Sequence, residues 1–486
     1  MPCTTFLAGR LATNDGSTMI SRTDDGRFDV KKMIVVNPKD QPRKYVSKIG
    51  HLTIELPDNP LRYTACPSVD DKHGIWAATG INSANVGMTA TETITTNSRV
   101  MGADPYVKYI KGKEDKDDIP GGIGEEDLVV LTLPYIKTAR EGVIRLGMLL
   151  EKYGTYESNG IAFNDENEVW WLESIGGHHW IARRVKDDEY VIMPNQFGLD
   201  RFDFDDAYGE QKENMCSKDL KEFVTKYHLD TKQEGEFNPR LAFGSHDDSD
   251  HCYNTPRGWF MARYFNPRTY KWDGENADFN PESDDIPWSL KPERKITIEE
   301  VKYILSSYYQ GTEYNPYGRG TSSKKGMYRP IGISRTGVTS ICQIRPYVDD
   351  AIKGVEWLMF GSNAFNSTIP LYTNVDVMPE YVSNTTLEVN TNSFYWNSRL
   401  LGALADAHYS TSLIHIERYQ EAVLNGGQRL LNEYDAKYNE TKDVNILKEA
   451  NEKICEMAKK ETSSTLDKVL LNASEQMKNG YHRFDN

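Results

Sequence analysis

The sequence has no apolar run of about 18 residues, the length that a membrane-spanning helix needs, so we expect no such helix. It is also poor in positive charge: 57 Lys and Arg stand against 72 Asp and Glu, a net charge of −15. Binding to nucleic acid or to an anionic membrane needs clustered basic side chains, so neither partner is expected. The first residues lack the basic start and apolar stretch of a secretory signal. We therefore expect a cytoplasmic protein.

Cys-x-x-Cys pairs are absent as well. A zinc ribbon or a disulfide scaffold is therefore not expected, and reduced thiols fit best. The stretch His246–His251 has metal-ligating residue types, but six consecutive polar residues are more typical of a solvated loop. The glycines of Gly121–Gly124 follow no strand–helix unit, which argues against a nucleotide loop. We expect no metal and no cofactor. The six cysteines are Cys3, Cys66, Cys216, Cys252, Cys342 and Cys455.

Short apolar segments separated by Asn, Asp and Gly dominate the chain and indicate strands. A turn at 14–17 between segments 4–12 and 18–22 predicts a hairpin, and residues 159–198 predict a four-stranded meander. The sum is an α+β chain with many antiparallel strands. The other expected strands are 32–37, 51–56, 63–67, 74–79, 86–94, 337–345, 355–361 and 368–371.

Helical spacing of apolar residues appears in two regions. In the first, the acids of Glu125–Asp127 suit a helix start, and Pro134 is expected to separate two helices or open the second. In the second, residues 398–480 read as helical, with a break or cap at Asn425–Gly427.

Cys3 opens the first predicted strand, which gives it a specific chemical use. If Met1 and Pro2 are removed, the α-amine of Cys3 can act as general base on its own thiol. Position alone also fits an ordinary small apolar residue near a terminus. The predicted hairpin adds two side chains beside it: Arg22 would favour the thiolate, and Asp25 could hold the amine.

Several motifs carry a family resemblance. Cys-Thr-Thr at residue 3, Asp-Gly-Ser at 15 and Arg-Thr-Asp-Asp at 22 resemble the cysteine dipeptidases of the PepD type. These are N-terminal-nucleophile hydrolases related to bile-salt hydrolases and penicillin V acylases. The resemblance continues through 86–93, 253–257, 335–336 and 343–346, in the family's order.

The resemblance implies a four-layer αββα sandwich over residues 3–395, with a C-terminal helical extension, 396–486, packed on it. It implies Cys3 as nucleophile with Arg22 and Asp25 as its supports. Asn195 matches an Asn of the relatives whose amide can donate to the developing oxyanion, and Arg257 matches their second active-site Arg. The relatives' other oxyanion Asn has no clear counterpart, because the chain reads Thr-Glu-Thr at 91–93.

Dipeptides are the expected substrates, cleaved through a thioester. Pro2 must first leave, either by autoprocessing or through a host peptidase, because it acylates the Cys3 amine. Two alternatives remain open: an acylase acting on a bile-salt or penicillin-type amide, and a non-enzymatic protein of the same fold that keeps Pro2. A homo-oligomer also stays open. A dipeptidase needs a carboxylate for the substrate ammonium, and the sequence does not identify it.

Overall fold

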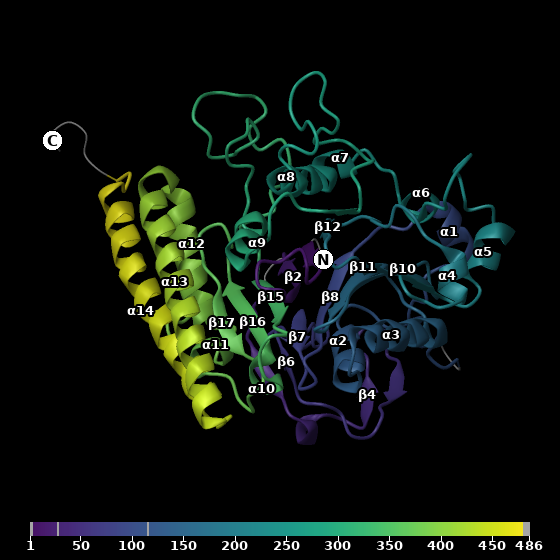
Figure 1. Cartoon of the computed structure of the whole chain (residues 1–486), viewed down its shortest axis with the longest axis horizontal. Coiled ribbons are helices and arrows are strands. Elements are labelled where there is room, and N and C mark those ends of the chain that lie inside the picture. The colour runs from purple at the N-terminus through teal and green to yellow at the C-terminus, as the bar shows by residue number, and fades with distance from the viewer. Residues whose placement is uncertain (1–2, 27–28, 114–115, 480–486) are drawn as a thin grey trace.

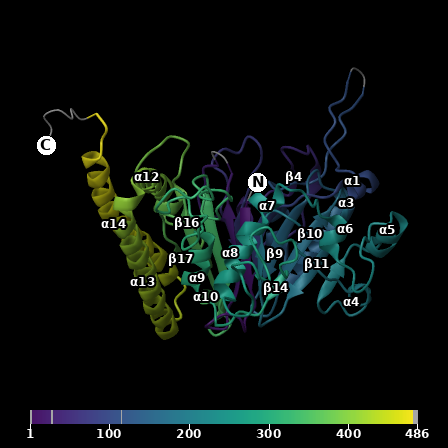
Figure 2. The same cartoon turned by 90° about the horizontal axis from the view of Figure 1, so that it is seen from above.

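The computed structural model describes residues 3–26, 29–113 and 116–479, except for the side chains of Thr91 and Glu92. Two antiparallel sheets lie face to face, with helices on both outer faces (Figures 1 and 2). Strands β1 and β2 of sheet 1 contact β8 of sheet 2 across the interface. This is the expected αββα sandwich.

Sheet 1 has seven strands in the order β14-β12-β1-β2-β15-β16-β17, and sheet 2 has six in the order β13-β11-β10-β9-β8-β7. The bounds in sheet 1 are β1 Cys3–Ala8, β2 Thr18–Asp24, β12 Tyr190–Met193, β14 Ser289–Leu290, β15 Val338–Ile344, β16 Gly354–Phe360 and β17 Ile369–Tyr372. Those in sheet 2 are β7 Thr79–Ile81, β8 Gly87–Thr93, β9 Asn159–Asn164, β10 Val169–Ile175, β11 His179–Val185 and β13 Asn214–Cys216. Two small ladders pair β3 Ile34–Val36 with β6 Tyr63–Ala65 and β4 Lys44–Val46 with β5 Thr53–Glu55.

Helices α2 and α3 cover sheet 2, while α8, α9 and the C-terminal helices cover sheet 1. Pro134 lies in a short 3-10 turn between α2 and α3, which separates them as expected. The helices are α1 Ser98–Ala103, α2 Leu128–Thr132, α3 Ala139–Tyr153, α4 Phe204–Tyr208, α5 Leu220–Lys226, α6 Pro239–Phe243, α7 Asp250–Tyr253, α8 Thr255–Phe265, α9 Ile298–Leu305, α10 Asp350–Lys353, α11 Glu380–Ser383, α12 Phe394–Ala407, α13 Tyr409–Thr441 and α14 Ile446–Glu475.

The predicted N-terminal hairpin is confirmed, with Cys3 opposite Asp24 and Thr5 opposite Arg22. Every residue of β1 is buried. Because side chains alternate along a strand, Phe6 packs into the core below the outer helices, whereas Leu7 packs between the two sheets. Cys3 has the same parity as Leu7, so it faces sheet 2.

The four strands predicted in 159–198 are present, but they do not form one meander. Strands β9, β10 and β11 pair in sequence within sheet 2, and β12 then crosses to sheet 1 and pairs with β1. The prediction was wrong on this point because strand patterning does not specify which edge a strand joins. The crossing brings the segment after β12 to the start of β1.

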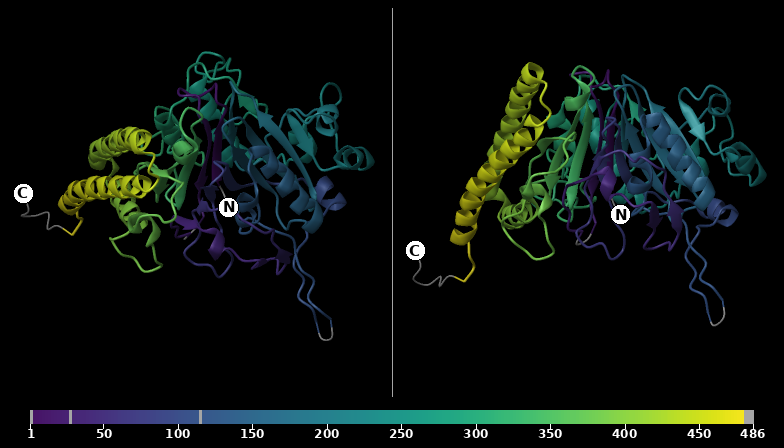
Figure 3. Two further views of the ribbon diagram at one scale, coloured as in Figure 1. Left: turned by 60° about the horizontal axis from the view of Figure 1, so that its bottom comes forward. Right: turned by 90° about the horizontal axis from the view of Figure 1, so that it is seen from below.

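Three helices complete the chain. Helices α13 and α14 pack on β17, and α12 packs on β16 (Figure 3). The break expected at Asn425–Gly427 is wrong, since α13 continues through it. A Cβ at Gly427 would lie 2.7 Å from Cδ of Pro370. The glycine therefore permits close packing on β17, and the chain reverses only at Lys442, in the left-handed conformation.

Candidate functional site

Cys3 begins β1, between β2 and β12 in the middle of sheet 1. It is fully buried. Its backbone nitrogen donates to Oδ1 of Asn195 at 3.2 Å, and its Sγ accepts from Nη2 of Arg22 at 3.0 Å. Both groups that an N-terminal nucleophile uses, the nitrogen and the thiol, therefore meet polar partners from other strands or their ends.

Arg22 links the thiol to a carboxylate. Its Nη2 also donates to Oε1 of Glu125 at 2.8 Å. Burial by itself would lower the pKa of Arg22, but the charges of Cys3, Asp24 and Glu125 raise it well above its ordinary value. The guanidinium therefore stays charged beside the sulfur and favours the thiolate.

Other buried cysteines have different surroundings. Burial raises the pKa of the Cys66, Cys342 and Cys455 thiols. The carboxylate of Glu356 also raises the pKa of Cys66 and Cys342. These thiols stay protonated near neutral pH, and Cys3 is the cysteine with a guanidinium on its sulfur.

Glu125 pairs with Arg22, a contact that the sequence did not indicate. The acids of 125–127 were expected at a helix start, and α2 begins directly after them, with Asp127 at its N-cap position. Glu125, in contrast, is buried against Arg22. Its backbone nitrogen donates to Oε1 of Glu157 at 2.8 Å. A buried Arg needs a buried counter-charge, and this need explains the position of Glu125. The sequence carried no signal for the pairing beyond an acid run before a helix.

Asn195 and Arg257 form the opposite side of the site. Asn195 follows the end of β12, and Arg257 lies in the first turn of α8. Nη2 of Arg257 donates to Oδ1 of Asn195 at 2.8 Å and to Oδ1 of Asn254 at 2.7 Å, while Nη1 donates to the carbonyl of Cys3. The amide of Asn195 donates from Nδ2 to the carbonyl of Thr93 at 2.9 Å. The network fixes the orientation of that amide, because Arg has donors only.

Asp25 is connected to the site through the side chain of Thr23. Its carboxylate accepts from Arg329, from Oγ1 of Thr336 at 2.7 Å and from Oγ1 of Thr23 at 3.1 Å. Oγ1 of Thr23 in turn accepts from the nitrogen of Thr4 at 3.1 Å. Asp25 thus braces the start of β1, and its role toward the Cys3 amine stays a prediction. Sequence reasoning did not identify Arg329, which follows a long loop.

The end of β8 borders the same site. The carbonyl of Thr93 accepts from Asn195, so the strand expected to supply the other oxyanion donor does lie beside Cys3. The side chains of Thr91 and Glu92 lie outside the described part of the chain, and the expectation for that donor falls on them.

A cavity of about 570 Å³ opens beside Asn195 and Thr93. Its wall continues through the segment from Ser245 to Asn254, and Asp247 and Asp250 are the charged side chains among its described lining residues. The cavity adjoins the network around Cys3 through Asn195 and Asn254.

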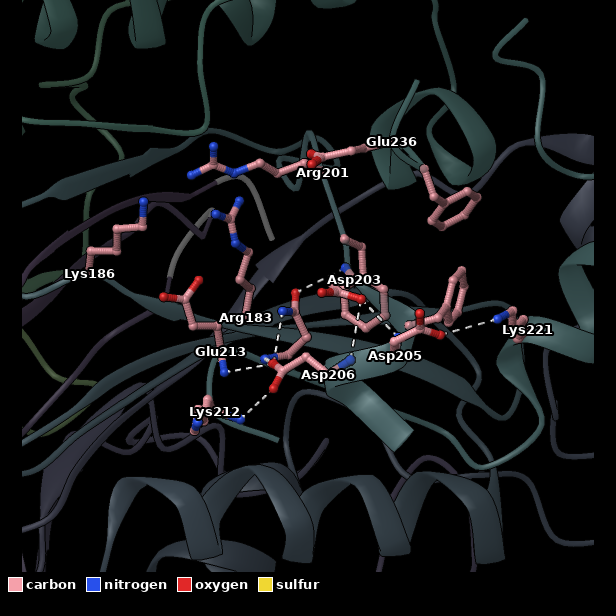
Figure 4. A pocket seen from close by; sticks show the side chains of 14 residues that line it. Arg183, Lys186, Arg201, Asp203, Asp205, Asp206, Lys212, Glu213, Lys221 and Glu236 are labelled. Atoms are coloured by element: carbon pink, nitrogen blue, oxygen red, sulfur yellow. Dashed lines mark hydrogen bonds and ion pairs between the residues drawn. The ribbon is translucent and has the colours of Figure 1, made fainter. Parts of the chain in front are cut away.

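A larger pocket of about 780 Å³ lies elsewhere, along β11, β13 and α4. None of the residues around Cys3 lines it. Its acids and bases are intermixed, and Asp206 is occupied by the backbone nitrogens of residues 212–214. Figure 4 shows Arg201 beside Glu236, Lys221 beside Asp205 and Lys212 beside Asp206, so opposite charges lie next to one another. Because its acidic and basic side chains are intermixed, the pocket does not indicate a catalytic or binding site.

No helix in the described ranges is long and apolar enough to cross a membrane. Within those same ranges, no group of three or more His, Cys, Asp or Glu is arranged to hold a metal ion.

The chain is similar in sequence to several proteins named dipeptidases. A dipeptidase of Bifidobacterium longum (strain NCC 2705) is 49% identical, with 100% of both chains covered. Probable dipeptidase A of Streptococcus pyogenes serotype M3 is also 49% identical, with 100% of both covered. Dipeptidase A of Lactobacillus helveticus is 48% identical over 84% of this chain and 82% of its own.

Among solved structures, a mutant of the conjugated bile acid hydrolase from Clostridium perfringens aligns over 76% of this chain and 92% of its own. Its identity is 12% and its TM-score is 0.32. The model of Peptidase family C69 matches residues 2–422, which include Cys3 and the residues gathered around it. The family resemblance seen in the sequence is thereby confirmed: the chain belongs to peptidase family C69.

Proposed function

We propose that the protein is a dipeptidase in which Cys3, once it is the N-terminal residue, is both nucleophile and general base. The observation that carries the proposal is the pair of contacts at one residue. Sγ of Cys3 lies 3.0 Å from the Arg22 guanidinium, and its nitrogen lies 3.2 Å from Oδ1 of Asn195. Full-length relatives named dipeptidases support the substrate class.

The reaction begins when the α-amine of Cys3 takes the thiol proton and the thiolate attacks the scissile carbonyl. Arg22 holds the sulfur, and Nδ2 of Asn195 donates to the oxyanion. The protonated amine then gives its proton to the leaving amine, and the N-terminal residue of the substrate remains on sulfur as a thioester. Water, deprotonated by the same amine, attacks the thioester and releases the N-terminal amino acid of the substrate and the Cys3 thiol.

The mechanism requires that Met1 and Pro2 leave. We propose that hydrolysis of the Pro2–Cys3 bond produces the active enzyme, by autoprocessing or through a host peptidase. Asn195 Oδ1, which accepts from the Cys3 nitrogen, would then accept from the free amine.

N-terminal sequencing and the intact mass of the purified protein test this step, together with hydrolysis of alanyl-alanine by the wild type and a Cys3→Ser variant. We expect a chain that begins at Cys3, and a variant whose activity falls by several orders of magnitude. Cys455→Ala, which changes a thiol buried in α14, should stay active. A fully active protein that retains Pro2 would exclude the α-amine as base.

We propose that residues 396–486 form an extension on a hydrolase domain of residues 3–395, and the ion pair of Arg345 with Asp435 at 2.6 Å supports that packing. The six free cysteines favour a reducing cytoplasm. Fractionation of cells tests the location, and light scattering tests for a homo-oligomer.

A further inference from the structure

The cavity beside Asn195, the residue that accepts from the Cys3 nitrogen, carries negative charge. Asp247 is exposed at its rim and Asp250 is half-buried in its wall. Asp250 accepts hydrogen bonds from Asn254 and from Oγ of Ser245 at 3.3 Å. These donors are neutral, and no cation of the described chain forms an ion pair with Asp250.

Asp250 is also tied to the reaction centre. Nδ2 of Asn254 donates both to the Asp250 carboxylate and, at 3.2 Å, to the carbonyl of Asn195. Oδ1 of Asn254 accepts from Arg257, which contacts Cys3 and Asn195. One amide group therefore separates the carboxylate from the residue that faces the Cys3 nitrogen, and it fixes the carboxylate in the cavity wall.

A half-buried carboxylate without a cation favours a positively charged ligand. Burial raises the pKa of Asp250, and the charge of Asp247 raises it further. Of the groups in a dipeptide, the α-ammonium is the cation, and it lies two bonds from the carbonyl carbon that Cys3 attacks. When the substrate carbonyl lies at Sγ of Cys3, the ammonium can therefore reach only a part of the site wall that is close to the thiol.

We propose that Asp250 binds the α-ammonium of the substrate and thereby restricts cleavage to the first peptide bond of a free amino terminus. The inference rests on the proposed function, because it assumes that Cys3 attacks a peptide carbonyl at this site. Asp247 contributes to the negative potential from the rim. A non-peptide amide without an ammonium would leave Asp250 uncompensated and is disfavoured.

The test compares two substrates that differ in the ammonium alone. Alanyl-alanine and propionyl-alanine contain the same scissile amide, but the second has hydrogen in place of the ammonium. We expect the wild type to prefer alanyl-alanine strongly in kcat/KM. In Asp250→Asn this preference should fall about 10- to 100-fold, the effect of one lost charge-assisted hydrogen bond, with kcat/KM for propionyl-alanine little changed.

Asp248→Asn is the matched control, because it removes the same charge from an exposed residue outside the cavity lining. It should keep the wild-type preference. Asp250→Ser keeps an acceptor for Asn254 and replaces Asp250→Asn if circular dichroism shows that the latter is unfolded. The rate of Cys3 alkylation should stay near that of the wild type in both Asp250 variants.

An unchanged preference in a folded Asp250 variant overturns the inference and leaves the proposed function standing. A wild type without any preference for the ammonium also overturns it. If the wild type, beginning at Cys3, hydrolyses neither substrate, the proposed function fails first, and the inference fails with it.

Discussion

The nitrogen of Cys3 donates to Oδ1 of Asn195 at 3.2 Å, although 192 positions separate the two residues. Arg257 donates to the same oxygen, and the carbonyl of Thr93 accepts from Nδ2 of the same amide. The oxygen of Asn195 therefore faces the nucleophile's nitrogen, and its NH₂ group faces the end of β8. This orientation allows one amide both to hold the amine and to donate to an oxyanion.

Asn195→Ala should lower kcat by about 100- to 1,000-fold, with a smaller effect on KM, because an oxyanion donor acts in the transition state. Steady-state kinetics with alanyl-alanine measure both constants. Gln196→Ala, at the neighbouring position, should change kcat little. A loss that appears in KM alone would show that Asn195 binds substrate and does not stabilise the oxyanion.

Arg22→Lys keeps a positive charge but loses the planar group that contacts Sγ of Cys3 and Glu125 together. We expect alkylation of Cys3 by iodoacetamide to slow about 10- to 100-fold at neutral pH, and the pH midpoint of alkylation to rise. Mass spectrometry of the modified N-terminal peptide gives the rate. Arg429→Lys, on the exposed face of α13, is the control. Equal alkylation rates in both variants would count against Arg22 as the thiolate partner.

The buried carboxyl group of Glu173 should make the stability of the folded protein depend on pH. Burial raises its pKa to about 7, although Trp171 and the nitrogens of Gly198 and Leu199 donate to it. Between pH about 4.5 and 7 the folded protein thus holds a proton that the unfolded chain has released. The contribution of Glu173 to the free energy of unfolding therefore falls as the pH rises through this window.

Glu173→Gln removes this titration. The variant's stability relative to wild type should rise from pH 4 to pH 8 by up to about 3 kcal/mol. Urea unfolding at several pH values measures the change. Glu440→Gln, at an exposed position of α13, should show no such slope. A Glu173→Gln profile parallel to wild type would mean that Glu173 is ionised throughout the window.

Gly427→Ala should destabilise the protein by about 1–3 kcal/mol, because the new methyl group would meet Pro370 of β17 at 2.7 Å. This cost exceeds the gain of up to about 1 kcal/mol in helix propensity. Gly102→Ala in α1 is the matched control, since nothing lies within 4 Å of its Cβ position. It should be neutral or stabilising in thermal unfolding, and a stabilising Gly427→Ala would contradict the close packing.

Much of the fold was predictable because the signals are local. Turn residues between apolar runs located most strands, and the N-terminal hairpin followed from one turn at residues 14–17. Helix ends were less certain. Asn425–Gly427 looked like a break, but glycine also occurs where a helix packs closely on a strand, and a sequence does not distinguish the two cases.

The sequence by itself determined the half of the site that one hairpin builds. Strands joined by a short turn must pair, so Arg22 had to lie near Cys3. Tertiary structure decided the other half. Strand β12 leaves its sequence neighbours in sheet 2 and pairs with β1, which brings Asn195 to Cys3. Glu125, Arg257 and Arg329 arrive from other distant segments. The physical reason is that every sheet edge offers the same backbone hydrogen bonds, so only the packing of the whole chain selects the edge.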